Sequence, residues 1–418
     1  MKNSLRRNIL LYFTGRGVST FGDELHKIAL AWLMLELTGK ASGLGSMMGI
    51  QEFSLGIFGL IAGIIVDKFS RKRIIVVSDL IQGLVVFFLL FIPAYLGSIS
   101  TLNIYLIAFF YPFLLQLFFL ASIAFIPEIV PKEYLFSFNA FKTSFFTSIA
   151  FIGSGVAGLF IKMFGYSTCF FIDSMTSIFA ATCGAMIIVK SRSNIKKDRA
   201  KNKENFKSYL SMLKEGFVEF RKNRAFFAVT LLSTIGDFLI PFFLWIPVAI
   251  RRWNGDAFTY GITQSVMAVG MIIGGIAANT LLKKFLRKFN NVQINLGAKF
   301  IIGLIFLITT IFFNIYSLMA MMFLFGLVTS ISKASVQTYL QETIEQGKMG
   351  RVTSVISATQ TISAPLSLFL GGVLLDIFSP RSMLAFYGVI FIIQMIVGFR
   401  IRAIREYCKQ KSLGGSET

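Results

Sequence analysis

The chain has 418 residues, of which 55% are hydrophobic and only 15% are charged, and its mean hydropathy is +0.72. A soluble globular protein could not cover its surface with so few charged side chains. Apolar stretches of twenty or more residues recur along the chain, which matches the roughly 20-residue helix that crosses a hydrocarbon core about 30 Å thick. The composition therefore excludes a water-soluble fold and predicts an all-α polytopic membrane protein.

The net charge of +21 does not indicate a nucleic-acid partner, because the 41 Lys and Arg residues lie mostly in short segments between the apolar stretches. Cys169 and Cys183 fall on one expected helix, about 21 Å apart, and Cys408 lies in the C-terminal tail. Neither a disulfide framework nor a cysteine metal site is expected from that spacing. His26 is the only histidine, which excludes a metal site built on several histidines.

Hydropathy predicts twelve membrane spans. An even number of spans places both termini on the same side of the membrane. In chain order, the expected spans are 9–37, 43–66, 74–96, 101–125, 137–162, 167–189, 225–250, 257–282, 292–313, 316–338, 352–377 and 382–402.

The first expected span, 9–37, carries charged residues within an apolar stretch. Charged side chains inside a bilayer are costly and usually face the interior of a helix bundle or pair with one another. At 100° per residue, a polar stripe follows one side of this helix. It is formed by Arg16, Thr20, Asp23 and Lys27, with Glu24 beside it. We expect this stripe to face a central cavity.

The acidic residues of the stripe admit two interpretations. Asp23 or Glu24 could take up and release protons, because removal from water disfavours the charged form of a carboxyl group. Alternatively, Asp23 forms a permanent ion pair with Lys27, one turn away, that only fixes helix packing. Glu52, in the second span, lies at roughly the depth of Lys27 and is a further candidate partner. His26 is either a packed, hydrogen-bonded group or a proton relay.

The loop after the second span reads Gly63-Ile64-Ile65-Val66-Asp67-Lys68-Phe69-Ser70-Arg71-Lys72-Arg73. Asp67 is placed to accept hydrogen bonds from the N-terminal turn of the eleventh span, near Gly350 and Arg351, where the helix dipole favours an anion. That contact would latch the two halves of the chain together on the inside. The alternative is that the cations at 71–73 only enforce the topology.

Small residues and one proline in the fifth and eleventh spans are expected to allow close helix approach or bending. They are Gly153, Gly155, Gly158, Pro365, Gly371 and Gly372. Because small residues pack helices in many membrane proteins, they indicate no particular function.

The longest hydrophilic stretch, 190–224, separates six expected spans from the other six and holds 12 of the basic residues. We therefore expect an N-terminal six-helix bundle over 1–189, a linker over 190–224, a C-terminal bundle over 225–402 and a tail over 403–418. With both termini inside, the outer segments carry only five basic residues: Lys40, Lys162, Arg251, Arg252 and Arg381. Basic residues resist translocation, so this asymmetry predicts cytoplasmic termini.

The second part of the linker has the pattern of an amphipathic helix. Apolar residues recur at three- and four-residue spacing, at Phe206, Leu210, Leu213, Phe217 and Phe220. We expect this helix to lie on the membrane surface and to be attracted to anionic lipid head groups. A calmodulin-like target or a nucleic-acid contact is the alternative.

The two halves of the chain resemble each other. Ser19-Thr20-Phe21-Gly22-Asp23-Glu24-Leu25 in the first span recurs 214 residues later as Ser233-Thr234-Ile235-Gly236-Asp237-Phe238-Leu239, and the same displacement relates Gly158 to Gly372. Matches at corresponding points of two six-helix halves indicate a duplicated transporter architecture. Asp237 is then the counterpart of Asp23, and either titrates, attracts a cation or forms an interhelical hydrogen bond.

The segment 63–73 resembles the signature loop of the major facilitator superfamily, with Ser70 where the family usually has glycine. In that family the loop stabilises the outward-facing state. The resemblance implies a twelve-helix fold of two pseudo-symmetric bundles, and a conformational latch formed by Gly63, Asp67, Lys68, Arg71, Lys72, Arg73 and Asp79.

A narrower resemblance is to the twelve-helix drug:proton antiporters of the macrolide-efflux and siderophore-exporter branch. It is carried by Gly22-Asp23, Ala31-Trp32, Leu37-Thr38-Gly39, Asp79, the loop Ile126-Pro127-Glu128-Ile129-Val130-Pro131 and Asn139. The fourth span departs from many proton antiporters of the superfamily because it carries no basic residue.

The resemblance implies an exporter in a bacterial cytoplasmic membrane. It would move a lipophilic or amphipathic small molecule, such as a drug, macrolide or siderophore, by alternating access and proton antiport. Protons and membrane lipids would be its other partners. No cofactor is expected, and no Gly-x-x-x-x-Gly-Lys-Ser/Thr motif is present for ATP.

Three other functions remain open from the sequence. An importer or facilitator of a metabolite or lipid would have the same fold. A membrane enzyme is disfavoured by the single histidine and the lack of a clustered polar catalytic set, and a binding protein that does not transport is the third. Substrate identity and oligomeric state do not follow from the residues.

Overall fold

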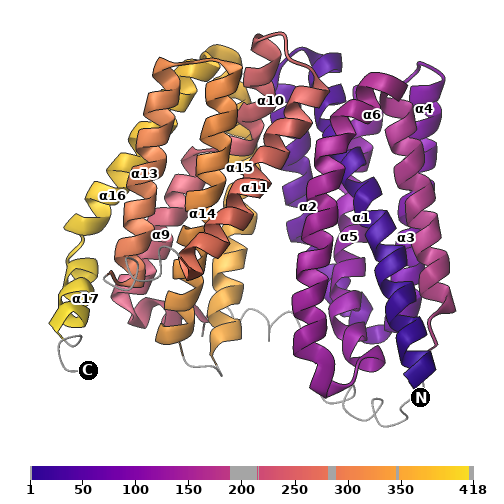
Figure 1. Ribbon diagram of the computed structural model, residues 1–418, viewed down its shortest axis with the longest axis horizontal. Helices are drawn as coiled ribbons and strands as arrows, with labels where there is room; N and C mark the ends of the chain where they lie inside the picture. The colour runs from indigo at the N-terminus through magenta and orange to yellow at the C-terminus, as the bar shows by residue number, and fades with distance from the viewer. Residues whose placement is uncertain (1, 189–213, 215, 281–288, 345–347, 414–418) are drawn as a thin grey trace. The chain divides into compact units, whose positions relative to one another are not determined.

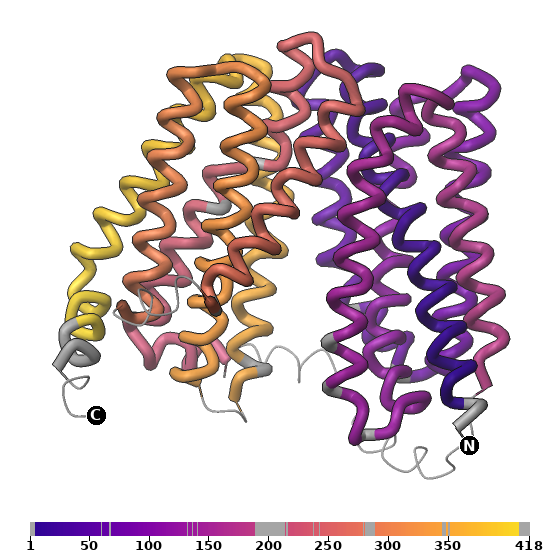
Figure 2. Tube along the Cα trace, in the orientation of Figure 1, coloured from indigo at the N-terminus to yellow at the C-terminus, as the bar shows by residue number. Residues whose placement is uncertain are grey.

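The computed structural model describes residues 2–188, 214, 216–280, 289–344 and 348–413. Its elements are helices, and no strand occurs within these ranges (Figure 1). The chain divides into two compact units: unit 1 consists of Met1–Lys203 and Ile250–Ser265, and unit 2 of Glu204–Ala249 and Val266–Thr418. In Figure 2, the helices of residues 2–188 gather in one bundle and those beyond residue 290 in another.

Unit 1 is built from long helices because its apolar runs leave no other way to pair backbone groups in a membrane. The chain turns at Gly39 and Gly97, whose φ angles of 68° and 66° favour glycine. The α3 helix continues through a π-helical turn into α4. The bounds are α1 Lys2–Thr38, α2 Ala41–Lys68, α3 Arg71–Val86, η1 Phe87–Phe91, α4 Ile92–Tyr95, α5 Thr101–Ile129, η2 Lys132–Tyr134 and α6 Leu135–Met186.

The α6 helix contains the fifth and sixth expected spans as one helical segment. The break between them is at Gly165, whose φ of 78° and ψ of 176° are not helical. Both parts pack on α1, where Gly17 approaches Phe145 and Gly22 approaches Thr176, and the last part also packs on α3 at Gly83. Gly165 therefore separates two helices that the hydropathy had already separated near this point.

Unit 2 contains the remaining helices, together with the first part of α10 and the second part of α11. The seventh expected span is interrupted at Pro241, which ends one helix and precedes the next. The bounds are α9 Arg224–Leu239, α10 Phe242–Arg252, α11 Ala257–Asn279, α13 Asn291–Ile311, α14 Ile315–Thr343, α15 Met349–Ile377, α16 Pro380–Arg400 and α17 Arg402–Leu413.

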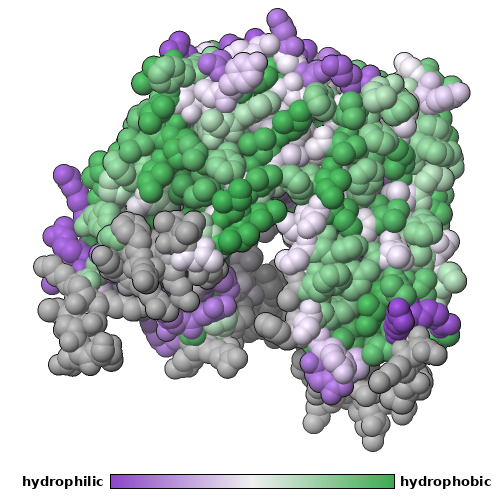
Figure 3. All heavy atoms as spheres, viewed as in Figure 1, coloured by the Kyte–Doolittle hydropathy of each residue, from purple (hydrophilic) through white to green (hydrophobic). Residues whose placement is uncertain are grey.

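Eight of the described helical segments are long and apolar enough to cross a membrane. The expected spans 9–37, 43–66 and 225–250 coincide with α1, α2 and the pair α9 and α10 but are not among the eight, so the number of twelve spans stays a prediction. Figure 3 shows apolar side chains over most of the visible helix surface and hydrophilic ones near the helix ends. Such a surface is suited to lipid rather than to water.

The expected amphipathic linker helix falls largely outside the described residues. Of the expected linker helix, Phe217 and Phe220 are described, and the residues from 189 to 213 are not. The segment 250–265 belongs to unit 1, whereas the expected boundaries put it in the C-terminal bundle. The expected division into two bundles, a linker and a tail stays a prediction.

The segment 250–265 is anchored to α1 and α6 by polar and aromatic contacts. Lys162 Nζ lies 3.2 Å from Asp256 Oδ2, and Trp32 stacks on Tyr260 with ring centroids 6.2 Å apart. Partial burial alone would raise the pKa of Asp256, but hydrogen bonds from Thr259 and the Lys162 ammonium lower it. The Asp256 carboxylate is therefore charged at neutral pH and holds this contact.

Gly158 of α6 is the point of closest approach to this segment. A Cβ atom at this position would lie 2.2 Å from the Cα of Phe258 and 2.3 Å from the carbonyl oxygen of Ala257. Both neighbours are backbone atoms, which cannot move aside as a side chain can. Glycine is thus the residue that lets α6 lie directly against the start of α11.

We predict that Gly158→Ala lowers the thermal unfolding temperature of the detergent-solubilised protein, because overpacking against backbone costs about 1–3 kcal/mol. The matched control is Gly63→Ala in α2, where a Cβ atom would meet nothing within 4 Å. Since alanine forms helix better than glycine, the control should be at least as stable as wild type. Equal stability of the two variants would contradict the close contact.

Candidate functional site

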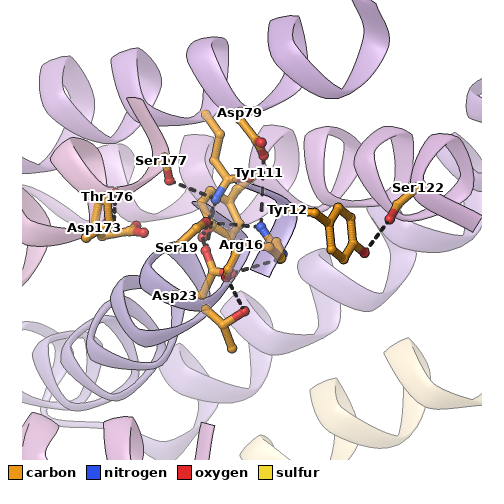
Figure 4. A network of polar contacts seen from close by, with 12 residues as sticks. Tyr12, Arg16, Ser19, Asp23, Asp79, Tyr111, Ser122, Asp173, Thr176 and Ser177 are labelled. Carbon is orange, nitrogen blue, oxygen red and sulfur yellow. Dashed lines mark hydrogen bonds and ion pairs between the residues drawn. The ribbon is translucent and has the colours of Figure 1, made fainter. Parts of the chain in front are cut away.

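Arg16 lies at the centre of a polar cluster inside unit 1 (Figure 4). Its guanidinium donates hydrogen bonds of 3.0 Å to Ser19 Oγ and to Asp23 Oδ2. Residues three and seven positions apart share one face of a helix, which explains why a single arginine of α1 reaches both. The cation also lies over the ring of Phe118 of α5, 4.1 Å from its centroid, in a cation–π contact.

Asp23 accepts hydrogen bonds from three helices. Besides the bond from Arg16, Gln82 Nε2 of α3 and Tyr111 OH of α5 each lie 3.0 Å from Asp23 Oδ1 and donate to it. Hydrogen bonds from donors, one of them charged, stabilise a carboxylate in its ionised form. The observed partner of Asp23 is therefore Arg16, two turns away, rather than Lys27 as one expectation had it.

Asp79 of α3 faces the same arginine from the other side. Its Oδ1 lies 3.9 Å from Arg16 Nη1, which is an ion-pair distance but too long for a hydrogen bond. The Asp79 side chain is only 2% exposed, and Oδ1 is buried without a hydrogen-bond partner. The resemblance grouped Asp79 with the loop latch, whereas the fold places it beside Arg16 in the core of unit 1.

A second buried pair adjoins this cluster. His26 Nδ1 of α1 lies 2.9 Å from Asp173 Oδ2 of α6, with side chains 3% and 0% exposed. The imidazole stacks on the ring of Tyr111, with centroids 4.6 Å apart and an interplanar angle of 7°. Gln82 extends the network to Ser177 of α6 at 3.3 Å. His26 is thus a packed group beside a carboxylate, and its role as a proton relay stays a prediction.

The remaining charged residues of the stripe lie outside this cluster. Lys27 Nζ is 3.5 Å from Glu24 Oε2, and the lysine side chain is 64% exposed. Glu52 of α2 is partly buried. The partner of Lys27 in unit 1 is therefore Glu24, one turn before it, and not Glu52.

The residues of the signature loop lie at one end of unit 1. Arg71 Nη1 contacts Glu128 Oε1 of α5 at 2.6 Å, and Lys72 Nζ donates to the carbonyl oxygen of Ala185 of α6 at 2.6 Å. Lys68 and Arg73 are exposed. Arg71 and Lys72 thus bind α3 to its neighbours in addition to carrying positive charge.

The expected contact of Asp67 lies outside the described side chains, as do Gly350 and Arg351. The other small residues have different neighbours. A Cβ atom at Gly153 would lie 3.0 Å from Glu24 Cβ, at Gly155 it would lie 2.6 Å from Ser265 Oγ, and at Gly371 it would lie 2.1 Å from Pro241 Cγ. Gly372 is buried, and Pro365 lies within α15. In unit 2, Pro241, which interrupts the seventh expected span, therefore packs on Gly371 of the eleventh.

Unit 2 contains a buried cation, Lys299 of α13, in the middle of an apolar helix. Its Nζ donates to Gln394 Oε1 of α16 at 2.9 Å and to Ser233 Oγ of α9 at 3.1 Å. The Gln394 amide donates in turn to the carbonyl oxygen of Leu232 at 3.1 Å. It also packs on Gly236, where a Cβ atom would lie 1.5 Å from Gln394 Nε2. The second copy of the repeat thus contributes Ser233 and Gly236 to this site.

Lys299 occupies the position in unit 2 that Asp79 has in unit 1. Asp79 lies four residues before Gly83, and Lys299 lies four residues before Gly303. Gly83 packs on the part of α6 that follows Gly165, and Gly303 packs on α16. Gly83 approaches the carbonyl oxygen of Ser174, and Gly303 that of Gly388. The duplication therefore places a carboxylate in one bundle and an ammonium in the other. The side chain of Asp237 lies outside the described residues.

Unit 2 also has an apolar groove of about 470 Å³ between α9 and α15. That volume is within the range of about 300–1,000 Å³ that small-molecule sites occupy. Two hydroxyl groups, of Thr359 and Ser363, interrupt its apolar lining. The other lining residues are Phe217, Phe238, Val355, Ala358, Ile362 and Leu366.

Sequence reasoning missed several of these residues. Lys299 carries the same signal as Asp23, a lone ionisable residue within an apolar span, and the cost of burying a charge could have identified it. Asp173 carries that signal as well. Gln82 and Tyr111 carry no comparable signal, because polar but uncharged side chains are common in membrane helices.

A protein-family model described as "Major Facilitator Superfamily" matches residues 12–367 of the chain. The chain is 23% identical to macrolide efflux protein A of Streptococcus pyogenes, over 97% of this chain and 98% of that protein. It is 22% identical to the staphyloferrin A transporter of Staphylococcus aureus, over 88% of this chain and 89% of that protein. Among solved structures, the nucleoside transporter NupG superposes with a TM-score of 0.70 at 12% identity, covering 95% of this chain and 98% of that one.

These relatives and the structural neighbour are transporters and not enzymes. The family implies a small-molecule substrate and a multi-pass membrane protein, as the apolar helices do. The match extends over most of the chain, including the buried cluster of unit 1 and the groove of unit 2. The chain therefore belongs to the Major Facilitator Superfamily, the family that its signature loop resembles.

Proposed function

We propose that this protein exports a lipophilic or amphipathic small molecule from a bacterial cell in exchange for protons. The observation that carries the proposal is the buried cluster of unit 1, where Asp23, Asp79 and Asp173 share one arginine and one histidine. Ionisable groups are costly inside a membrane protein and typically mark ion or proton pathways. The cluster has three acidic groups and two basic groups. This excess of acidic groups favours a proton held within the cluster.

Two further observations support export of an apolar compound. The groove of unit 2 has an apolar lining with two hydroxyl groups, which suits a molecule with a large hydrophobic part. Relatives over nearly the full chain are named as a macrolide efflux protein and a staphyloferrin A transporter. Both names are compatible with outward movement of a sizeable organic molecule.

The proposed orientation places both termini in the cytoplasm of the bacterium, with the protein in its cytoplasmic membrane. The five basic residues of the outer segments, against 12 in the linker alone, support it. The signature loop would then lie on the inside. We propose that Gly63, Asp67, Lys68, Arg71, Lys72 and Arg73 latch the two halves there during alternating access.

The test is uptake into inverted membrane vesicles from a bacterial host that expresses the protein. Macrolides, lipophilic cations and siderophores are supplied outside the vesicles, with and without an imposed pH gradient that is acidic inside. We expect gradient-dependent accumulation of at least one class, and its collapse on addition of a protonophore. Vesicles without the protein provide the background.

Import is the second candidate, because the same fold and the same cluster could couple protons to inward movement. Accumulation in right-side-out vesicles, driven by a gradient that is acidic outside, would favour it. Uptake that does not depend on the pH gradient, in inverted and in right-side-out vesicles, would contradict proton coupling.

A further inference from the structure

We infer that Asp79 holds the transported proton, and that it exchanges this proton with water in a small cavity on the side of unit 1 that carries the N-terminus. The inference rests on the proposed proton exchange and identifies its site. It differs from the expectation for Asp23, which the sequence placed in the centre of the polar stripe.

The hydrogen bonds distinguish the two carboxyl groups that share Arg16. Asp23 accepts bonds of 3.0 Å from Arg16, Gln82 and Tyr111. Asp79 Oδ1 accepts none, and its distance to Arg16 Nη1 is 3.9 Å. Donors stabilise the ionised form, and a buried carboxylate without them is strongly disfavoured. A proton shared between the two groups therefore resides on Asp79.

The charges around Asp79 lead to the same assignment. The titratable groups that act on it are Tyr12, Arg16 and Asp23 of α1, and Lys72 of its own helix lines the same cavity. The cavity-lining residues of α5 and α6 are apolar, at Phe118, Phe125, Ala180 and Gly184, as is Ile187 directly after α6. With one adjacent guanidinium for two carboxyl groups, the neutral arrangement is Arg16 paired with Asp23 beside a protonated Asp79.

A cavity beside Asp79 provides space for a water molecule that accepts the proton. It has a volume of about 20 Å³ and is lined by Lys72, Ile75 and Asp79 of α3 together with Arg16. One water molecule requires about 10–15 Å³ and several polar partners, and Asp79 Oδ1 and the Arg16 guanidinium supply them. Lys72 lies about 10 Å from Asp79 along the helix, at the end of unit 1 that the basic residues predict to be cytoplasmic.

Release of the proton has a defined consequence for Arg16. When Asp79 gives its proton to water in the cavity, the O–H bond breaks, its electron pair stays on the carboxylate, and a negative charge appears 3.9 Å from Arg16 Nη1. The guanidinium then moves by about 1 Å to bond Asp79, since ion-pair hydrogen bonds are about 2.7–2.9 Å long. Gln82 and Tyr111 remain as donors to Asp23. The charge state of Asp79 on α3 thereby determines which carboxylate the Arg16 side chain of α1 contacts.

Infrared spectroscopy of the full-length protein in lipid tests the assignment without any transport. A protonated carboxylic acid has a carbonyl stretching band that shifts in D₂O and disappears when the group ionises. We expect the wild type to show this band at neutral pH and to lose it as the pH rises. Asp79→Asn should lack the band, and Asp79→Glu should restore one with a different midpoint.

Asp23→Asn tests the role of Arg16 in the same experiment. It frees the guanidinium for Asp79, so the band should disappear at a pH about one to three units lower than in wild type. A merely structural Asp79 would show no such shift. The control is Glu406→Gln, which removes an exposed carboxylate of α17 that pairs with Arg402.

The outcomes separate this inference from the proposed function. A band that persists in Asp79→Asn, with folding verified by size-exclusion chromatography, overturns the inference, as does a wild type that shows no band at any pH. Uptake that ignores the pH gradient contradicts proton exchange instead, and leaves the infrared assignment of Asp79 intact.

Discussion

Asp23→Asn is expected to abolish gradient-driven transport while leaving the protein folded and inserted in the membrane. The substitution keeps the size of the side chain but removes the charge that holds Arg16 at 3.0 Å. Arg16 then pairs with Asp79 and keeps it ionised, so no proton can be carried. A loss of about 100-fold in initial uptake rate corresponds to roughly 2.7 kcal/mol, and we expect at least this loss.

The measurement is the initial rate of gradient-driven uptake into inverted vesicles, normalised to the amount of protein in the membrane. Glu406→Gln is the matched control, because it also removes one carboxylate but from an exposed pair. Unchanged coupling in Asp23→Asn would remove Asp23 from the mechanism. Equal losses in both variants would indicate a general effect of net charge.

Arg16→Gln is expected to have the largest effect on stability. It removes the only cation within ion-pair distance of both Asp23 and Asp79 among the described residues, and breaking a buried pair by removing one partner costs about 3–5 kcal/mol. The Phe118 ring loses its cation–π contact as well. The unfolding temperature of the purified protein, with urea unfolding as a second probe, measures the loss.

A double substitution tests whether the unpaired charge causes the loss of stability in Arg16→Gln. Arg16→Gln combined with Asp23→Asn leaves no unpaired charge at this pair, so it should be more stable than Arg16→Gln alone. Arg16→Lys should be intermediate, because an ammonium is a point charge and lacks the fork that reaches Ser19 and Asp23 together. A double variant that is less stable than Arg16→Gln would show that packing, not charge, dominates.

The pairing of Asp23 illustrates where sequence reasoning stopped. Helical periodicity correctly brought Arg16 and Asp23 to one face of α1, but it also offered Lys27, which is nearer in sequence. The choice depends on the surroundings of each cation. Arg16 is 15% exposed among buried side chains, whereas Lys27 is 64% exposed and pairs with Glu24. Periodicity gives the direction of a side chain on its helix and does not give the environment on that side.

The glycines show the same division. A high content of small residues in the fifth span indicated close packing, and the helix that fills the space against Gly158 is the start of α11. No local feature of the span distinguishes Gly158 from Gly153 or Gly155. Gly158 differs from the other two because it lies against the backbone of residues 257 and 258, about 100 positions along the chain.

The sequence by itself determined the helical membrane fold, the family and the face of α1 that carries charge, because hydropathy, a loop signature and helical periodicity are local properties of the chain. Only the tertiary structure decided which charges meet. Asp79 reaches Arg16, Asp173 reaches His26, and Lys299 reaches Ser233 and Gln394 across different helices. Those contacts depend on the rotation and depth of each helix within its bundle, which are set by packing against all its neighbours at once.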